Sequence, residues 1–292
     1  MNDPLAHPSL ADDPRLVAAR PDLAAEPLRG KVKAARYVQA RPRRVITPAA
    51  ALRKAPETGR ALETELIFGE IFDVYEFHGG WAWGQARRDG YVGYVEERAL
   101  SSARPVPTHR VAALRGFLYP GPGIKMTPLG YLPFGAEVSV ESTEGGFARL
   151  AEGFVFAGHL APLGAREADP VSVAETFLGI PYLWGGKSSL GLDCSALVQT
   201  ACHACGITAP RDSDMQEKVL GERIEIPNDP AHYRRGDLLF WPGHVALARG
   251  DGTMIHATAY SMNVIVEPLA EALARIESQG TPLRNARRLT FG

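Results

Sequence analysis

The sequence predicts an α+β protein in which a short N-terminal arm and small β-barrels precede a mixed domain. Glycine (30 of 292 residues) and proline (23) are frequent, which is typical of chains with many turns and short strands. Residues 41–164 contain short β-type runs broken by Gly-Gly and Asp-Gly turn signals. Residues 165–292 instead place helical segments before an antiparallel meander, as in α+β domains.

Composition and charge exclude several classes of protein. Hydrophobic residues make up 45% and charged residues 22%, as in ordinary globular proteins. No run approaches the roughly 18 consecutive apolar residues of a membrane span, and a net charge of −1 provides no basic field. We therefore expect no nucleic acid and no membrane as partners, and no cofactor. Polar and proline residues interrupt every apolar run near the N-terminus, so we expect no signal peptide and a cytoplasmic location.

Residues 1–40 are rich in proline and alanine and carry no chemical motif. We interpret them as an arm that packs on a neighbouring domain, with one short helix around Glu26–Tyr37. The Arg41–Arg44 cluster that follows is interpreted as a solvated linker face.

Residues 41–102 are expected to form the first small barrel, because short β-type runs recur between turn signals. The run GWAWGQARRDGYVGYV, which starts at Gly80, resembles the bacterial SH3-like domains. We interpret Trp81, Trp83 and Tyr94 as barrel core, whereas Tyr91 is expected to serve the site.

Residues 103–164 look like a weaker copy of that barrel. Gly145-Gly146-Phe147 parallels Gly79-Gly80-Trp81, and the two stretches align at an offset of about 64–66 residues. The period fits two tandem SH3-like domains.

Residues 165–292 are expected to form a separate domain. The pattern predicts a helix over Val171–Leu178 and a second one that opens at Cys194 and ends at Gly206. Strands are expected over Asp237–Trp241 and on both sides of the turn at Gly250-Asp251-Gly252.

Cys194 is the first candidate for chemistry. Asp193 is a good N-cap residue, which places Cys194 in the first turn of its helix. The unpaired N–H groups and the dipole there favour an anion, and this lowers the pKa of a thiol. A buried structural cysteine is the competing interpretation.

Two histidines strengthen the catalytic interpretation. His244 and His256 flank the glycine turn, and a hairpin centred on Gly250 places them directly opposite each other on one face. A catalytic thiol needs a base, and that base needs an orienting partner.

The surrounding residues carry a family resemblance. The runs PYLWGGKSSLGLDCSALVQ, PRDSDMQ and RRGDLLFWPGHVALARGDGTMIHA resemble the NlpC-like cysteine peptidases of bacterial cell-wall metabolism. The resemblance implies a papain-like catalytic domain over residues 165–292. It also implies that Cys194 is the nucleophile, His244 the base and His256 the residue that orients His244.

The whole architecture resembles the γ-D-glutamyl-L-diamino acid endopeptidases, which cleave murein tripeptides and tetrapeptides with a free N-terminal L-alanine. The resemblance implies that Tyr91 and Asp212 bind the substrate ammonium, together with an acidic residue of the first barrel. Glu63 is the candidate for that acid, with Glu57 and Glu65 as competitors. A loop carboxylate paired with Arg211 is the other interpretation of Asp212. Further expected pocket residues are Asp193, Ser195, Arg211 and Ser213.

Two weaker motifs are set aside. Gly186-Lys187-Ser188 lacks the glycine that a phosphate-binding loop needs at position 181. Cys202 and Cys205 have zinc-type spacing but no second pair of ligands, so we expect both in the core and no metal.

The leading hypothesis is a cytoplasmic cysteine endopeptidase of murein peptide recycling. The alternatives are an exported hydrolase of intact peptidoglycan, with the barrels as wall anchors, and a non-catalytic SH3-based binding protein. Activity on polymeric murein separates the first two, and the reactivity of Cys194 tests the third.

Overall fold

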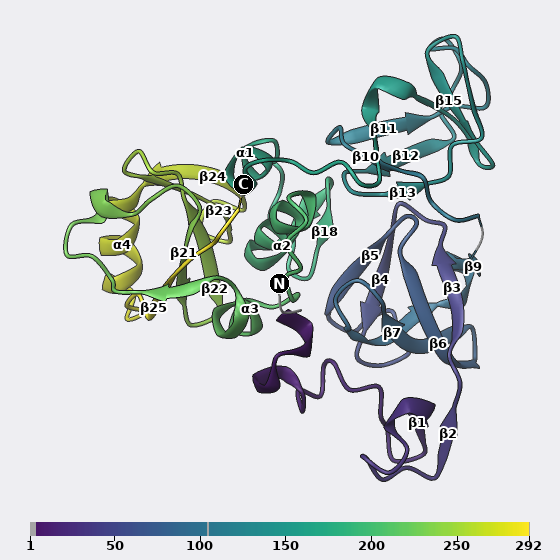
Figure 1. The fold of residues 1–292 in the computed structure, drawn as a ribbon, viewed down its shortest axis with the longest axis horizontal. Coiled ribbons are helices and arrows are strands. Elements are labelled where there is room, and N and C mark those ends of the chain that lie inside the picture. The colour runs from purple at the N-terminus through teal and green to yellow at the C-terminus, as the bar shows by residue number, and fades with distance from the viewer. Residues whose placement is uncertain (1–3, 104, 292) are drawn as a thin grey trace. The chain divides into compact units, whose positions relative to one another are not determined.

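The computed structural model describes residues 4–103 and 105–291, and the chain divides into two compact units. One unit comprises residues 11–165, and the other comprises residues 166–291 together with residues 4–10. The first is built from β-sheets, and the second places helices beside one large sheet (Figure 1). Among the described helices, none is long and apolar enough to cross a membrane.

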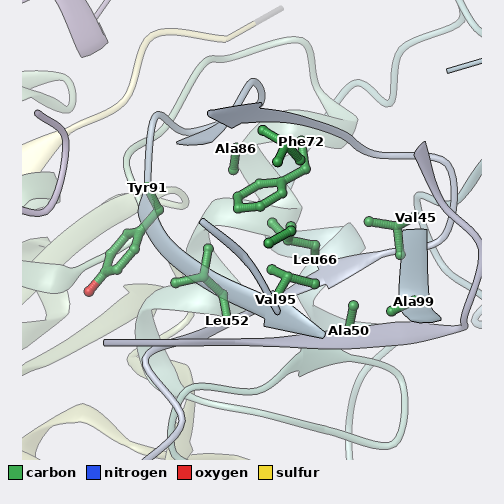
Figure 2. Packing of buried hydrophobic residues seen from close by; sticks show 11 residues of the cluster. Val45, Ala50, Leu52, Leu66, Phe72, Ala86, Tyr91, Val95 and Ala99 are labelled. Carbon is green, nitrogen blue, oxygen red and sulfur yellow. The ribbon is translucent and has the colours of Figure 1, made fainter. Parts of the chain in front are cut away.

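Residues 41–102 fold into a seven-stranded antiparallel sheet with the strand order β5-β4-β8-β7-β6-β3-β9. Fully buried side chains such as Leu52, Phe72 and Val95 fill its core (Figure 2). The elements are β3 (Arg41–Val45), β4 (Ala49–Arg53), β5 (Thr64–Ile67), β6 (Ile71–His78), β7 (Trp81–Ala86), β8 (Val92–Glu96), the 3-10 helix η4 (Glu97–Ala99) and β9 (Leu100–Ser102).

Residues 11–40 pack on this sheet, as expected for the arm. Leu23 shares a buried cluster with Trp83. The Arg20 guanidinium lies 4.4 Å from the centre of the Trp83 ring and donates a 2.8 Å hydrogen bond to the Tyr94 hydroxyl. Trp83 and Tyr94 are therefore packing residues that hold the arm. Two short parallel strands belong to the arm, β1 (Leu23–Ala25) and β2 (Arg36–Val38).

The helix expected around Glu26–Tyr37 does not form. Only the 3-10 helix η3 (Glu26–Leu28) is present, with a proline in its first turn. Gly30 then adopts a φ of +80°, a left-handed conformation that does not continue a helix. The chain leaves this turn into β2. Two further 3-10 helices lie nearer the N-terminus, η1 (Pro4–Ala6) and η2 (Pro8–Leu10).

The interpretation of Arg41–Arg44 as a solvated linker face is also wrong. These residues lie in β3, and Arg44 is buried, with 4% of its surface exposed. Its guanidinium pairs with Glu152 and stacks over the Phe68 ring at 5.1 Å. Pairing within the fold thus compensates the buried charge.

Residues 105–162 form three small antiparallel sheets around a second core that includes Val111, Leu132 and Val155. The strand orders are β13-β10-β17, β11-β12 and β14-β15-β16. The elements are β10 (His109–Val111), β11 (Arg115–Leu118), β12 (Gly130–Pro133), β13 (Glu137–Val138), β14 (Ser142–Glu144), β15 (Phe147–Leu150), β16 (Gly153–Phe156), the 3-10 helix η5 (Ala157–His159) and β17 (Leu160–Pro162).

The two β regions repeat the same local structure. Gly79 and Gly80 turn between strands with φ of +57° and +81°, and Gly145 and Gly146 do so with φ of +56° and +82°. In each region the second glycine's carbonyl accepts a hydrogen bond from the first residue of the following 3-10 helix, at 2.8 Å in one and 2.9 Å in the other. Each region also pairs its first strand with its last, β3 with β9 and β10 with β17.

The second unit carries four helices in its described part. Asp169 caps α1 by accepting from the backbone N–H groups of Val171 and Ser172. This helix ends at Glu175, before the Leu178 that was expected. The helices are α1 (Pro170–Glu175), α2 (Cys194–Ala204), α3 (Ser213–Val219) and α4 (Leu269–Ser278), with the 3-10 helix η6 (Pro230–His232).

One six-stranded antiparallel sheet, in the order β20-β25-β21-β22-β23-β24, carries the expected meander. The helix α2 packs against β22 and β23, which brings the start of the helix to the hairpin. The strands are β20 (Glu222–Ile224), β21 (Asp237–Trp241), β22 (His244–Ala248), β23 (Thr253–Thr258), β24 (Asn263–Pro268) and β25 (Asn285–Arg288); a separate ribbon pairs β18 (Lys187–Ser188) with β19 (Gly191–Leu192).

Candidate active site

Cys194 is the first residue of α2, as the sequence predicts. The Asp193 carboxylate accepts a 2.8 Å hydrogen bond from the backbone N–H of Ala196 and so caps the helix. Cys194 is 6% exposed. Its sulfur lies beside the backbone N–H groups of Ser195 and Val245, which favour the thiolate. The contact with Val245 places the thiol at the start of β22, the strand that begins with His244.

A buried ion pair fixes the helix start. The Arg211 guanidinium, which is 0% exposed, donates to both carboxylate oxygens of Asp193, at 2.9 and 2.7 Å. It also donates to the Ser195 hydroxyl and to the carbonyl of Gly186, at 2.9 and 3.1 Å. Such a forked contact holds both partners in one orientation. Asp193, Ser195 and Arg211, which were expected as pocket residues, therefore lie around Cys194 and bind one another.

The thiol is less acidic than its helical position alone predicts. Burial, together with the neighbouring Asp193 carboxylate, raises the pKa of the Cys194 thiol to about 12. The N–H groups of Val245 and Ser195 and the charge of Arg211 act in the opposite direction but do not outweigh burial. The expectation of a lowered pKa was wrong, because it counted the helix dipole and not the desolvation of the thiolate.

The two histidines form a direct contact. His244 Nε2 lies 2.8 Å from His256 Nδ1, and the ring centres are 5.0 Å apart. Burial, helped by the neighbouring His256 and Arg275, lowers the pKa of His244 to about 3. His244 is therefore a neutral imidazole at physiological pH, the form that accepts a proton.

The hairpin register differs from the expected one. Leu247 pairs with Ile255 and Ala248 with Met254, so the turn is centred on Asp251 and not on Gly250. Continued along the strands, this register puts His256 opposite Ala246, two residues from His244. Because side chains alternate between faces with a period of two, a shift of two keeps both imidazoles on one face. They meet diagonally across the sheet.

Sequence reasoning missed Glu267 and Arg275. The Glu267 carboxylate on β24 lies 2.8 Å from His256 Nε2 and 2.5 Å from the Arg275 guanidinium. Its interactions with His256 and Arg275 lower the pKa of Glu267 and keep it ionised. Glu267 lies 11 residues beyond His256, and no motif marked it; only the pairing of β23 with β24 brings it to the site.

Tyr182 is a second residue that the sequence did not single out. Burial raises the pKa of its hydroxyl, and the nearby Cys194 and Asp193 raise it further. The phenol therefore stays protonated beside the nucleophile, where it is a hydrogen-bond donor. The sequence signal that could have identified Tyr182 is its position after Pro181 in the run PYLWGG.

The residues expected to bind the substrate ammonium come from both units. Asp212 caps α3 without a side-chain hydrogen bond to the helix, and Ser213 is the first residue of that helix. Glu63 and Tyr91 belong to the first barrel. Tyr91 is 3% exposed and part of the barrel core, and its hydroxyl points away from the rest of that cluster (Figure 2).

The remaining cysteines are free thiols in the described structure. Cys202 is fully buried, and burial raises its pKa to about 12. Cys205 is only half-buried, so the core assignment holds fully for Cys202 and partly for Cys205. In residues 4–103 and 105–291, no cluster of three or more histidine, cysteine or acidic residues is arranged to hold a metal ion.

Comparison with known families matches two segments of the chain. Residues 179–277, which contain Cys194, His244 and His256, match the NlpC/P60 family. Residues 52–100 match the bacterial dipeptidyl-peptidase SH3 domain.

The chain is similar to a γ-D-glutamyl-L-lysine dipeptidyl-peptidase of Bacillus subtilis, with 28% identity over 241 residues, which is 74% of this chain and 79% of that protein. It is also similar to dipeptidyl-peptidase 6 of Lysinibacillus sphaericus, with 40% identity over 101 residues, 35% of this chain and 36% of that protein. A solved NlpC/P60 family protein from Bacillus cereus matches with a TM-score of 0.71 at 24% identity, covering 85% of this chain and 99% of that one.

Proposed function

Since residues 179–277 match the NlpC/P60 family and residues 52–100 match the bacterial dipeptidyl-peptidase SH3 domain, we propose that this chain is a cysteine endopeptidase of murein peptides. It cleaves the bond between γ-D-glutamate and the diamino acid in peptides with a free N-terminal L-alanine. The relatives from Bacillus subtilis and Bacillus cereus are named for the γ-D-glutamyl-L-lysine bond.

The observation that carries the proposal is the position of a thiol at a helix start beside a hydrogen-bonded imidazole pair. Cys194 lies against Val245, and the adjacent His244 contacts His256 at 2.8 Å. Nucleophilic catalysis by cysteine requires this set: a thiol, a base and a group that orients the base.

The chemistry starts from a neutral thiol and a neutral imidazole. As the Cys194 sulfur attacks the γ-glutamyl carbonyl carbon, its proton moves to His244, and a C–S bond forms while the carbonyl oxygen becomes an oxyanion. The carbonyl re-forms as the C–N bond breaks, and His244 gives its proton to the departing amine. The product is a thioester. His244 then takes a proton from water, the hydroxide attacks the thioester, and the thiol regains its proton as the glutamyl carboxylate leaves.

Two donors are proposed for the oxyanion. The backbone N–H of Cys194 is one, because the first N–H groups of a helix have no carbonyl partner within it. The protonated Tyr182 hydroxyl is the second, because it lies within electrostatic reach of the sulfur.

Recognition of the free N-terminal amine is assigned to Tyr91, Asp212 and Glu63. An ammonium group requires carboxylate or hydroxyl acceptors. Of the three candidate acids in the first barrel, Glu57 already pairs with Arg60 at 2.9 Å, and Glu65 interacts electrostatically with Tyr131. This leaves Glu63, which precedes β5, as the best candidate.

Four segments make up the chain in this proposal: the arm (1–40), a first SH3-like domain (41–102), a second one (103–164) and the peptidase domain (165–292). The equal φ angles at the two Gly-Gly turns support the second SH3-like domain. So does the matching hydrogen bond into the following 3-10 helix.

A requirement for a free L-alanine directs the enzyme to peptides already released from the glycan. We therefore place it in murein peptide recycling, in the cytoplasm. Cell fractionation tests the location, and activity on intact peptidoglycan exceeding that on free peptides would favour an exported wall hydrolase.

The decisive experiment is mass spectrometry of the purified chain acting on L-Ala-γ-D-Glu tripeptides and tetrapeptides that end in lysine or diaminopimelate, with and without N-terminal acetylation. We expect cleavage after D-glutamate only when the amine is free. The Cys194→Ala variant should be inactive, while Cys205→Ala, which removes a thiol outside the site, should retain full activity. Full hydrolysis by Cys194→Ala would refute the proposal.

A further inference from the structure

Two proton assignments fit the contact between the histidines. A neutral imidazole has one N–H donor and one bare acceptor nitrogen. Either His244 Nε2 donates to His256 Nδ1, or His256 Nδ1 donates to His244 Nε2, across the same 2.8 Å. In the first case Nδ1 of His244 is bare. In the second it carries the proton, and His244 has no nitrogen left to accept one from a thiol.

Glu267 distinguishes between these assignments. Its oxygen lies 2.8 Å from His256 Nε2, and an ionised carboxylate is an acceptor only. A bare Nε2 would turn its lone pair towards that negative charge, whereas an N–H places its positive end there. The N–H is not aimed squarely at the oxygen, but at 2.8 Å an oxygen with full or partial negative charge still favours a proton over a lone pair on Nε2. With the proton on Nε2, the Nδ1 of His256 must accept.

The register of the sheet brings His244, His256 and Glu267 together. His256 pairs with Ile265, so Glu267 lies two residues further along β24 on the same face. On β22, the strand on the other side of β23, the residue opposite His256 is Ala246, and His244 lies two residues from it. The three side chains therefore run diagonally over β22, β23 and β24. His256 is 1% exposed, so no bulk water competes for its nitrogens.

Arg275 balances the charge of this carboxylate. Its guanidinium contacts the same Glu267 oxygen at 2.5 Å and stacks on the Tyr260 ring at 4.0 Å. The ion pair with Arg275 keeps Glu267 ionised, so the oxygen that faces His256 is an acceptor only.

We propose that Glu267 is a positioning residue which, paired with Arg275, fixes the tautomers of His256 and His244 so that His244 presents a bare Nδ1 to the nucleophile. The proposal rests on the proposed cysteine-peptidase function for its catalytic meaning. The tautomer itself is a property of the free protein.

The direct test is two-dimensional ¹⁵N–¹H NMR of the full chain labelled at its eight histidines, with His244 and His256 assigned from single substitutions. We expect both rings to carry a proton at Nε2, and His244 to have a bare Nδ1, in the unaltered protein. In Glu267→Ala, we expect this preference to be lost at both rings. Glu267→Gln, whose amide oxygen still presents a partial negative charge to Nε2, should retain it. An unchanged ring pattern in Glu267→Ala, with the protein folded, would overturn the proposal.

Kinetics give the second readout. Loss of an outer group that orients a catalytic or ligating histidine typically costs about ten- to a hundredfold, so we expect kcat to fall by that amount in Glu267→Ala with KM nearly unchanged. Glu267→Gln should recover most of it. Glu271→Gln, which removes an exposed carboxylate one turn away on α4, is the matched control and should be unchanged. An equal loss in the Gln and Ala variants would show that charge, and not the tautomer, matters.

The two proposals fail separately. If the unaltered protein shows the Nε2 tautomers but cleaves no murein peptide, the proposed function fails and the positioning role of Glu267 stands. If it cleaves the peptides while His244 carries its proton on Nδ1, the function stands and the positioning role fails.

Discussion

His244 Nε2 lies 2.8 Å from His256 Nδ1, although the strand register sets the two residues two positions out of alignment. The diagonal contact holds because both side chains are on the same face and the imidazole rings are long enough to span the offset. It leaves one nitrogen of each ring for a second partner. This contact is the central feature of the candidate site.

Removal of His256 should therefore disable catalysis without abolishing substrate binding. For His256→Ala we expect kcat to fall by about 10²–10⁴-fold, the usual effect of losing acid–base function, with a smaller change in KM. Steady-state kinetics on the tripeptide measure this. His232→Ala, at an exposed histidine in η6, is the control. Because His256 is buried, thermal unfolding must show that the variant is folded; a folded variant with normal kcat would contradict the role.

The pH dependence should reflect a base of low pKa. His244 acts only when neutral, and its pKa is lowered to about 3, so its protonation removes activity only well below the ordinary value of 6.5. We expect kcat/KM to hold from pH 7 to pH 5, with unfolding monitored in parallel by fluorescence. A loss of activity with an apparent midpoint near 6.5 in the folded protein would show that His244 is not shielded in this way.

The thiol should react slowly in the free protein at neutral pH. Since burial raises the pKa of Cys194 to about 12, the rate of alkylation by iodoacetamide should rise continuously from pH 7 to pH 10. The Cys194→Ala variant gives the background from Cys202 and Cys205. A rate that is already high and flat between pH 5 and pH 8 would instead indicate a preformed thiolate–imidazolium pair.

Arg211 should stabilise the folded state as well as hold the residues of the candidate site in place. Arg211→Met leaves the Asp193 carboxylate buried without its partner, and breaking a buried ion pair costs about 3–5 kcal/mol. Urea unfolding measures the loss. The control is Lys218→Met, which breaks an i,i+4 pair with Asp214 in which the two side chains are 44% and 49% exposed. That change should cost less than about 1 kcal/mol. Equal losses in the two variants would contradict the structural role of Arg211.

Tyr91 should affect only substrates with a free amine. Loss of one hydrogen bond to a charged group costs about 1.5–3 kcal/mol, so Tyr91→Phe should lower kcat/KM about ten- to a hundredfold for L-Ala-γ-D-Glu peptides. The weak cleavage of N-acetylated peptides should not change. Tyr94→Phe removes a hydroxyl that contacts Arg20 of the arm, and it should leave both substrates unaffected. A similar loss on acetylated peptides would mean that Tyr91 acts through folding of the barrel.

The sequence by itself determined the parts of the site that local chemistry specifies. Asp193 before an apolar helix placed Cys194 at the helix start, and the glycine turn placed two histidines on one hairpin face. The Gly-Gly turns likewise revealed the repeat, because a tight hairpin turn requires φ angles that few residues other than glycine adopt. These are short-range constraints, and they can be read from spacing.

Only the tertiary structure decided what burial and strand pairing contribute. Desolvation raised the pKa of Cys194, whereas the helix dipole alone predicted a lowered pKa. Arg211, which the sequence suggested as a pocket residue, is buried and belongs to an ion pair. The pairing of β23 with β24 brought Glu267 to His256. Burial and register depend on residues distant in the chain, and for that reason no local pattern revealed them.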